Sequence, residues 1–443
     1  MTKNLKEKLL IKDNLDFGEK IFFTGTFFLP SALPIGAILL LISLIISIKK
    51  SYKSILKDKF NYIVLLSIFL ILISTINISL LNTPEKLRDY QNSFIFINLF
   101  NWIPILLGFI GFQSYLKRQD QRIYFIESLI LGSIPILFSC FLQIFGTQGP
   151  FKTLFGSIVW FLKPYEEVGG ITGIFNNPNY LSFWLIVTLP LVLYITTSKT
   201  YENKNLSRFI LGSISTLIII FALLTNSRNA ILGLFIIFIS KLSLRKSIFT
   251  IIFASTVLLF YFISPLTNTN SFTLQIFSQD NNLISKISYF FDVLIHSPRF
   301  EIWKSAVHFI SQKPILGWGG STFPYLNSFH NSKILTPIVF TDAQHTHNIF
   351  LELAHNFGIP LAILITSAIL YLLIRNLIKI KKENIKFDNL QSNAWLLSSF
   401  LVLLFHMTDI PYYDGRVSLL ISILFAGLRC ILNTGKESGL KVS

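Results

Sequence analysis

Residues 21–48 read IFFTGTFFLPSALPIGAILLLISLIISI. This run is apolar enough for one membrane-spanning helix, which needs about 20 apolar residues. Its centre, FLPSALP at residues 28–34, contains two prolines, and proline interrupts helical hydrogen bonding. The run is therefore either one interrupted helix or a hairpin of two helices, and the choice sets the topology of the whole chain.

The positions of the basic residues favour the hairpin. Lysine and arginine gather in short loops at residues 49–59, 117–122, 199–208, 241–246 and 375–386, and again in the C-terminal tail. Such loops are typical of the cytoplasmic side of a membrane protein. A single helix over residues 21–48 would place the lysine-rich N-terminus outside. We therefore expect a hairpin whose first arm extends back into residues 10–20, with both termini cytoplasmic.

The composition indicates a membrane protein. Of the 443 residues, 52% are hydrophobic and 14% are charged, whereas soluble domains carry about 25% charged residues. The formal charge of +16 does not indicate nucleic-acid binding, because the lysines lie in loops between apolar runs. The two cysteines lie in or beside apolar runs, which predicts core residues and no disulfide. The further apolar runs lie near residues 62–82, 93–116, 122–146, 180–198, 207–225, 229–241, 247–264, 349–376, 394–411 and 416–432. The predicted fold is all-α, with about 12 transmembrane helices.

Two longer segments, residues 147–179 and 265–346, fall on the external side in this topology. The second is too polar to cross a bilayer, and the pattern RFEIWKSAVHFI at residues 299–310 predicts an amphipathic helix within it. Loops of this length are uncommon unless they have a function. We divide the chain into N-terminal transmembrane helices (1–168), a central region with the external loop (169–376) and C-terminal transmembrane helices (377–443).

Four short stretches carry polar residues that the topology places on the external side. The first, GGITGIFNNPNYLSFWLIVTLPL at residues 169–191, combines glycines with Asn-Pro, which is turn chemistry before a helix. Asn179 is its candidate supporting residue. The second, LLTNSRNAILGLF at residues 223–235, places Arg228 in a very short connection. Arg228 either extends to the interface between lipid and water or binds an anion.

The third stretch is SPRFEIWKSAVHFISQKPILGWGGSTF at residues 297–323. Arg299 opens the amphipathic helix, and Pro314 with three glycines predicts a sharp turn after it. Walker-type and dinucleotide patterns are absent from the sequence, so a nucleotide site is not supported.

The fourth stretch is QHTHNIFLELAHNFGIP at residues 344–360, which holds His345, His347 and His355. A helix that starts near His347 would place His347, Leu351 and His355 on one face, with Glu352 pointing elsewhere. No metal-ligand spacing is present, so we expect no metal site. The histidines either cap the helix or supply a general base at the membrane surface, because imidazole titrates near neutral pH.

The C-terminal stretch FHMTDIPYYDGRVSLL at residues 405–420 adds Asp409, Asp414 and Arg416 at the same external end. These residues form either a structural salt bridge or part of the site. Ionisable residues at the ends of several separate helices converge on one face, which favours a functional site more than any single motif does.

Taken together, the stretches resemble the O-antigen ligase and polymerase-like membrane family. The matching pieces are GITGIFNNPNYLSFWLIVTLPL, TNSRNAILGLF, the Arg299 helix with PILGWGGSTF, and HTHNIFLELAHNFGIP, in the family's order across about residues 169–376.

The resemblance implies a glycosyltransferase of the bacterial inner membrane with its active site on the periplasmic face. It implies transfer of a glycan from a polyprenyl diphosphate carrier to a hydroxyl of a glycan or lipid acceptor, in lipopolysaccharide or other surface polysaccharide assembly. It further implies that Arg228 and Arg299 bind the diphosphate, that His347 is catalytic with His345 as a less certain neighbour, and that no nucleotide sugar, cofactor or metal is needed.

Two other classes of function remain as alternatives. A transporter of a small anion such as bicarbonate would use Arg228 and Arg299 to line a path, and would show charged or broken helices near the middle of the bilayer. A scaffold protein of an envelope-glycan assembly complex would tolerate substitution of the arginines and histidines.

Overall fold

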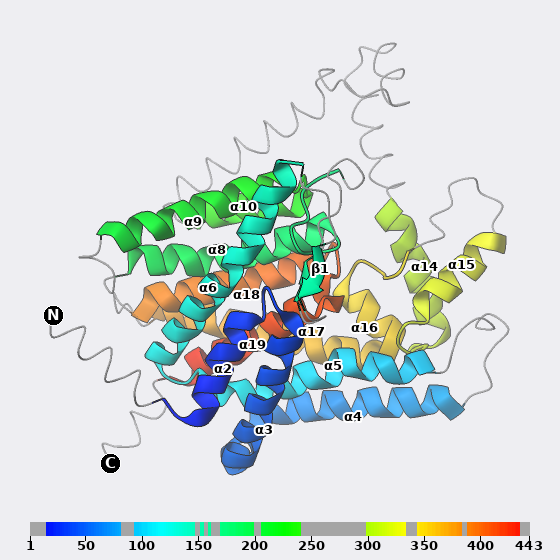
Figure 1. Cartoon of the computed structure of the whole chain (residues 1–443). Helices are drawn as coiled ribbons and strands as arrows, with labels where there is room; N and C mark the ends of the chain where they lie inside the picture. The colour runs from blue at the N-terminus through cyan, green and yellow to red at the C-terminus, as the bar shows by residue number, and fades with distance from the viewer. Residues whose placement is uncertain are drawn as a thin grey trace.

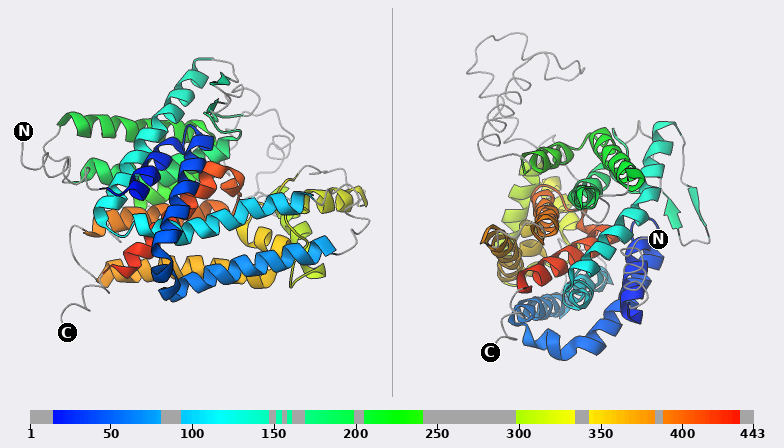
Figure 2. Two further views of the ribbon diagram at one scale, coloured as in Figure 1. Left: turned by 60° about the horizontal axis from the view of Figure 1, so that its bottom comes forward. Right: turned by 90° about the vertical axis from the view of Figure 1, so that its left-hand side faces the viewer.

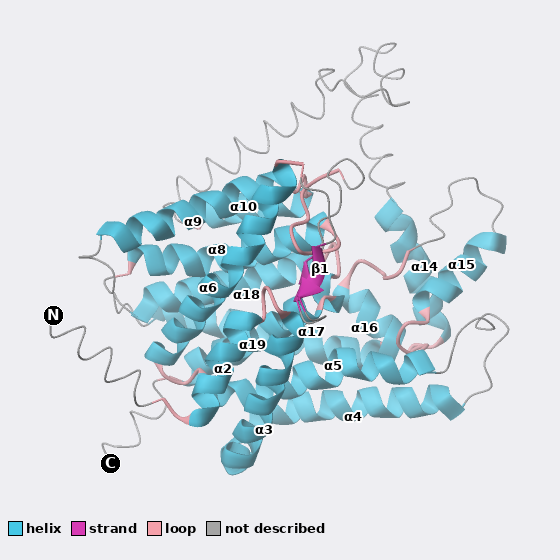
Figure 3. Ribbon diagram, in the orientation of Figure 1, coloured by secondary structure: helices cyan, strands magenta, loops and turns pink. Residues whose placement is uncertain are grey.

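The computed structural model describes most of the chain, in nine segments. These are residues 15–80, 93–146, 151–154, 158–160, 169–198, 205–240, 298–333, 343–382 and 388–434. The described part is almost entirely helical, as Figure 3 shows, apart from a small antiparallel pair of strands, β1 (Phe151–Leu154) and β2 (Ile158–Trp160). The predicted all-α membrane fold is confirmed.

Residues 21–48 do form a hairpin. Helix α2 (Phe17–Phe28) ends before the first proline, and α3 (Leu33–Lys57) begins with the second proline in its first turn. At the start of α2, Asp16 accepts the backbone N–H of Glu19 at 2.7 Å, while the Glu19 side chain accepts that of Asp16. This capping box fixes where α2 begins, so the first arm starts at residue 17.

The other predicted apolar runs that lie within the described residues also become helices. They are α4 (Lys59–Leu80), α5 (Ser93–Gly111) with the short helix η2 (Phe112–Tyr115), α6 (Gln119–Ile144), α8 (Pro178–Thr197), α9 (Asn205–Leu224), α10 (Arg228–Ile239), α17 (Ile359–Lys382), α18 (Asp388–His406) and α19 (Gly415–Asn433). Among the described residues, eight helices are long and apolar enough to span a membrane, and α10 and residues 390–406 are shorter apolar helices. The run at residues 247–264 lies outside the described residues, so the total of about twelve spans stays a prediction.

Helices α8 and α19 form the centre of the bundle. In each of these two helices, 78% of the 18-residue apolar stretch is buried inside the protein, compared with 22% in α9. Figure 2 (right) looks nearly along the bundle and shows red α19 crossing its middle. Residues that project from α8 and α19 therefore have fixed surroundings, and the loops at their ends are held in place.

Among the described residues, the predicted cytoplasmic loops at residues 49–59 and 117–122 and the end of α17 lie together with the end of α19 at one end of the bundle. Arg118, which precedes α6, pairs with Glu19 of α2 at 3.6 Å. Arg429, near the end of α19, donates to Asp58 between α3 and α4 at 2.8 Å. Lys379 of α17 donates to the carbonyl of Ile431 at 2.7 Å. The described basic loops therefore share one end, as the positive-inside pattern predicts.

At the opposite end stand three shorter helices, α14 (Pro298–Gln312), α15 (Phe323–Lys333) and α16 (Ile349–Phe357), on the right of Figure 1. The amphipathic pattern predicted at residues 299–310 is confirmed as α14. Its apolar side packs in a small core of its own around Phe309, Trp318 and Phe323. Of the candidate site residues, Arg299 lies in the first turn of α14, and His345 and His347 lie in the segment just before α16.

The predicted helix over residues 349–376 is divided in two. Gly358 has φ +95° and separates α16 from α17. A Cβ at this position would lie 2.0 Å from the carbonyl oxygen of Ile315, so only glycine fits the close contact with the Gly-rich turn. Gly358 followed by Pro360 is a sequence signal for a helix end and a new helix start, and the prediction of one continuous helix overlooked it.

Candidate functional site

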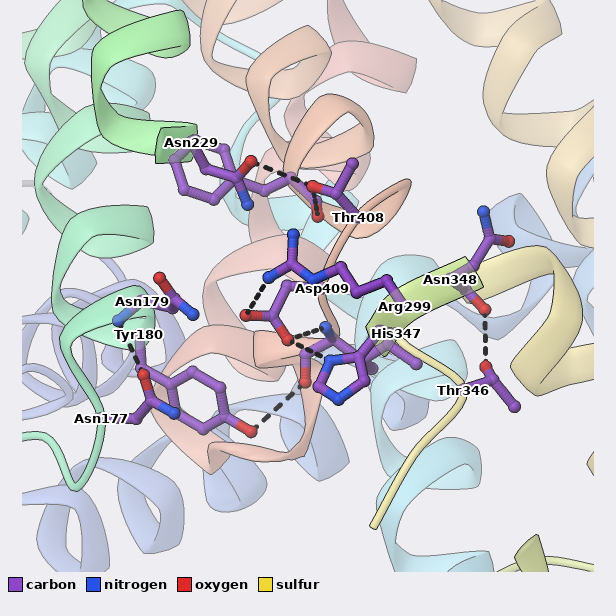
Figure 4. Close-up of polar contacts among 12 residues, drawn as sticks. Asn177, Asn179, Tyr180, Asn229, Arg299, Thr346, His347, Asn348, Thr408 and Asp409 are labelled. Carbon is purple, nitrogen blue, oxygen red and sulfur yellow. Dashed lines mark hydrogen bonds and ion pairs between the residues drawn. The ribbon is translucent and has the colours of Figure 1, made fainter. Parts of the chain in front are cut away.

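Asp409 joins the third and fourth polar stretches. Its carboxylate accepts a hydrogen bond from Nδ1 of His347 at 2.9 Å, and its other oxygen lies 3.9 Å from the Arg299 guanidinium. Asp409 follows α18, Arg299 is in the first turn of α14, and His347 precedes α16 (Figure 4). The side chain of Asp409 is 7% exposed, whereas those of His347 and Arg299 are 29% and 39% exposed. Three distant segments thus meet at a surface that water can reach.

The partner of His347 fixes the tautomer of its ring. An ionised carboxylate only accepts hydrogen bonds, so the proton of the neutral imidazole must be on Nδ1. The other ring nitrogen, Nε2, then carries a lone pair that can accept a proton. A carboxylate behind a histidine in this way orients the ring and stabilises its charged form.

Asp409 is ionised despite its burial. Burial raises the pKa of the Asp409 carboxyl. The hydrogen bond and charge of His347, the backbone N–H of Ile410 at 2.8 Å and the charge of Arg299 lower that pKa by more than burial raises it, so the net pKa lies below the ordinary value. A buried carboxylate with these partners is a stable counter-charge for both cations.

His347 sits before α16, not on its face. The helix begins at Ile349, and Asn348 caps it by accepting the N–H groups of Phe350 and Leu351 at 3.0 and 3.2 Å. His347 itself has φ +53°, a left-handed conformation that costs a residue other than glycine on the order of 1–3 kcal/mol. The expectation that His347, Leu351 and His355 share one helix face is therefore wrong, because the cap precedes the helix.

Glu352 holds the His347 loop in this conformation. Its fully buried carboxylate accepts the backbone N–H of Thr346 at 3.0 Å and the Nδ2 group of Asn356 at 3.1 Å. The Thr346 hydroxyl lies 3.0 Å from both Glu352 and the carbonyl of Asn348, and either can accept its proton. The expectation that Glu352 points elsewhere is wrong, because its carboxylate binds Thr346, next to His347. A carboxylate in the first turn of an apolar helix was the sequence signal that could have shown this.

His345 occupies a supporting position. Its ring stacks on that of Tyr413, with centroids 4.3 Å apart and planes 17° from parallel. Burial lowers the pKa of His345, and the charge of His347 lowers it further, against an opposite effect from Glu352. The imidazole is therefore neutral at pH 7 and packs as an aromatic ring.

His355 and the Gly-rich turn form one structural unit. The backbone N–H groups of Trp318 and Gly319 donate to the carbonyls of His355 and Asn356 at 2.7 and 2.9 Å. A Cβ on Gly317, which has φ +69°, would meet the same backbone at 2.6 Å. The turn of PILGWGGSTF therefore caps the end of α16.

Arg228 begins α10, and its side chain is exposed. Within the part of the chain that the structure describes, no ion pair or hydrogen bond of its guanidinium is present. Its neighbour Asn229 accepts the hydroxyl of Thr408 at 3.0 Å, so the start of α10 is attached to the residue before Asp409. Nothing in the sequence pattern had singled out Asn229 or Thr408.

The remaining supporting candidates separate into two kinds. Asp414 caps α19 and pairs with Arg416 at 3.0 Å. Arg416 in turn donates to the carbonyl of Pro30 at 3.1 Å. This pair is the structural salt bridge that the sequence left open. Asn179 lies in the first turn of α8, and the next residue, Tyr180, points its hydroxyl at the carbonyl of Ile410, 3.4 Å away.

Among the described residues, no group of three metal-ligating side chains gathers in one place. The arrangement combines an oriented imidazole, a buried carboxylate and an exposed guanidinium. Chemically, such a group can accept a proton from a hydroxyl and bind a phosphate oxygen.

Comparison with known proteins gives two findings. Residues 213–366 match the family described as O-Antigen ligase. The chain is also 27% identical over 394 residues to the ComP-specific O-oligosaccharyltransferase of Acinetobacter baylyi, an alignment that covers 86% of this chain and 65% of that relative. The chain thus spans about two-thirds of the length of the curated relative. The resemblance to the O-antigen ligase and polymerase-like family that the motifs predict is thereby confirmed, with residues 213–366 as the matched domain.

Proposed function

We propose that this membrane protein is a glycosyltransferase that moves a glycan from a polyprenyl diphosphate carrier to a hydroxyl of a glycan or lipid acceptor. The observation that carries the proposal is the contact of Asp409 with both His347 and Arg299. The match of residues 213–366 to O-Antigen ligase and the similarity to an O-oligosaccharyltransferase support the same class of reaction.

His347 acts on the acceptor. Its Nε2 lone pair accepts the hydroxyl proton as the hydroxyl oxygen bonds to the anomeric carbon of the glycan. Asp409 keeps the ring in the required tautomer and stabilises the imidazolium that forms. General-base assistance of this kind typically contributes about 10²–10⁴-fold to a rate.

The arginines act on the donor. As the new bond forms, the bond from the anomeric carbon to the diphosphate oxygen breaks, and its electron pair stays on the departing diphosphate. Arg299 and Arg228 bind the phosphate oxygens and stabilise this charge, because the guanidinium fork matches phosphate geometry. Arg299 is 39% exposed, which leaves room for a ligand beside Asp409.

The position of the site suits a substrate that lies partly in lipid. The Asp409 cluster is at the end of the bundle opposite the basic loops, which the positive-inside rule assigns to the cytoplasm. We therefore place the site on the periplasmic face of a bacterial inner membrane, with both termini cytoplasmic. The lipid tail stays in hydrocarbon while the diphosphate reaches water.

The anion-transporter alternative gains no specific support. Of the two arginines that a transporter would use, Arg299 pairs with Asp409 at the start of α14, and Arg228 is the first residue of α10. Neither lies in the middle of a span, where a transport path would need it.

The test uses Arg228→Ala, Arg299→Ala and His347→Ala, each produced at wild-type level and purified in detergent. Each variant should lose at least about 100-fold in glycan transfer from lipid-linked donor to acceptor. Arg118→Ala, at the other end of the bundle, is the matched control and should stay fully active. A deletion strain should accumulate lipid-linked glycan; unchanged surface glycan with impaired uptake of inorganic carbon would instead support transport.

A further inference from the structure

A polar cavity of about 410 Å³ lies between the segment before α8 and the turn between α9 and α10. Small-molecule sites in proteins occupy roughly 300–1,000 Å³, so the cavity is large enough for one ligand group. We call it the asparagine pocket, because four of its lining residues are asparagines. It is lined by Gly169, Asn176, Asn177, Pro178, Asn179, Thr225 and Asn226.

Two of the four asparagines hold the walls of the pocket. Asn177 accepts the backbone N–H of Asn179 at 2.8 Å and so caps α8. Asn226, which has φ +54°, donates to the carbonyl of Gly169 at 2.6 Å and thereby joins the two walls. These contacts fix the shape of the pocket in the absence of a ligand.

The other two asparagines are available to a ligand. The side chains of Asn176 and Asn179 have no hydrogen-bond partner within the residues that the structure describes. A side-chain amide offers both donors and acceptors. Sugar hydroxyls also donate and accept, so two open amides on a rigid wall suit a sugar ring.

The charge of the lining argues against a phosphate in the pocket. Among the described residues, the lining contains no lysine, arginine, aspartate or glutamate. The side chain of Asn177 already occupies the N-terminus of α8, which is where an anion would otherwise bind. The nearest cation along the chain is Arg228, two residues beyond Asn226, so an anion is better placed next to the pocket than inside it.

Both walls are attached to the segment that carries Asp409. The Tyr180 hydroxyl approaches the carbonyl of Ile410 at 3.4 Å, and Asn229 accepts the hydroxyl of Thr408 at 3.0 Å. Asn177 and Asn179 lie on the α8 side of the Asp409 cluster in Figure 4. A group in the pocket would thus adjoin a diphosphate held by Arg228 and Arg299.

We propose that the asparagine pocket binds the sugar ring attached to the diphosphate of the lipid-linked donor, with Asn176 and Asn179 hydrogen-bonded to its hydroxyl or acyl groups. This inference rests on the proposed function and adds to it a place where the first sugar is recognised. The pocket would set which sugar is accepted, since a missing or inverted hydroxyl leaves these amides unpaired.

The experiment compares two probes: lipid-linked glycan extracted from cells that lack the protein, and polyprenyl diphosphate without sugar. The double variant Asn176→Ala/Asn179→Ala should bind the glycan-bearing lipid about tenfold or more weakly than the wild type, since two hydrogen bonds are lost. Its affinity for the bare lipid should stay within about twofold. Asn205→Ala, an exposed asparagine at the far end of α9, is the matched control and should bind both probes as the wild type does.

Three outcomes overturn the inference. If the double variant binds both lipids as well as the wild type, the pocket holds no sugar. If it loses both lipids equally, the pocket holds the diphosphate. If the wild type binds neither lipid, the proposed function itself fails. This result differs from the first two outcomes, in which the wild type still binds the lipids and only the role of the pocket is wrong.

Discussion

The hydroxyl of Tyr413 donates to the buried carboxylate of Glu352 at 2.6 Å. This contact joins α16, whose Glu352 also holds the loop that carries His347, to the segment after α18, which carries Asp409. Burial raises the pKa of Glu352. The charge of His345, the Tyr413 hydroxyl and the Thr346 N–H lower that pKa by more than burial raises it, so the carboxyl is charged. Glu352 therefore sets the geometry of the His347–Asp409 pair without facing the substrate.

Glu352→Gln should lower the turnover number about tenfold or more and leave the KM for the lipid-linked donor within about twofold, because the glutamine cannot accept the same set of donors. The unfolding free energy should fall by about 1–3 kcal/mol. Steady-state transfer kinetics and thermal unfolding in detergent measure the two effects. Glu301→Gln, which removes only an exposed ion pair with Lys304, should change neither. Wild-type turnover in Glu352→Gln would show that the loop does not need this carboxylate.

Asp409→Asn should reduce transfer by about 10²–10⁴-fold, since an amide neither fixes the ring tautomer nor stabilises the imidazolium. Asp414→Asn is the comparison, because Asp414 pairs with Arg416 and caps α19. That variant should lose thermal stability and keep its turnover per folded molecule. If the two variants lose turnover equally, the assignment of Asp414 to structure is wrong.

Stability should decrease as the pH falls below about 6.5, the ordinary pKa of histidine. His345 and His355 both have pKa values lowered by burial. Between the lowered value and 6.5 the unfolded chain binds more protons than the folded chain, so stability rises with pH there and levels off above it. His345→Phe preserves the stack on Tyr413 and should make this dependence shallower, with the His355 contribution remaining. Melting temperatures from pH 5 to 8 test this; an unchanged slope in His345→Phe would contradict it.

Gly358→Ala should destabilise the fold by more than about 1 kcal/mol, because its φ is +95° and a Cβ would collide with the carbonyl of Ile315. Gly212→Ala in α9 is the matched control, since nothing lies within 4 Å of a Cβ there. That change should be neutral or slightly stabilising, as alanine favours a helix. Melting temperatures of the two variants decide the point, and equal values would mean that the break between α16 and α17 tolerates a side chain.

Local signals in the sequence were sufficient for most of the helices. The two prolines of FLPSALP predicted the turn between α2 and α3, and the apolar runs predicted the helices that follow it. The placement of lysines and arginines predicted that the loops at residues 49–59 and 117–122 and the end of α17 share one end of the bundle. These features depend on residues close together in the chain, so a single sequence contains them.

The contacts of the site depend on tertiary structure. Asp409 could be marked as a candidate, but its pairing with His347, 62 residues away, follows from how the segment before α16 meets the segment after α18. The same holds for Glu352, which meets Tyr413 across 61 residues, and for the Gly-rich turn that closes α16. By itself the sequence determined which segments are helical and which loops are basic, because propensity, proline and charge act locally. Only the packing of distant helices decided which carboxylate faces which histidine.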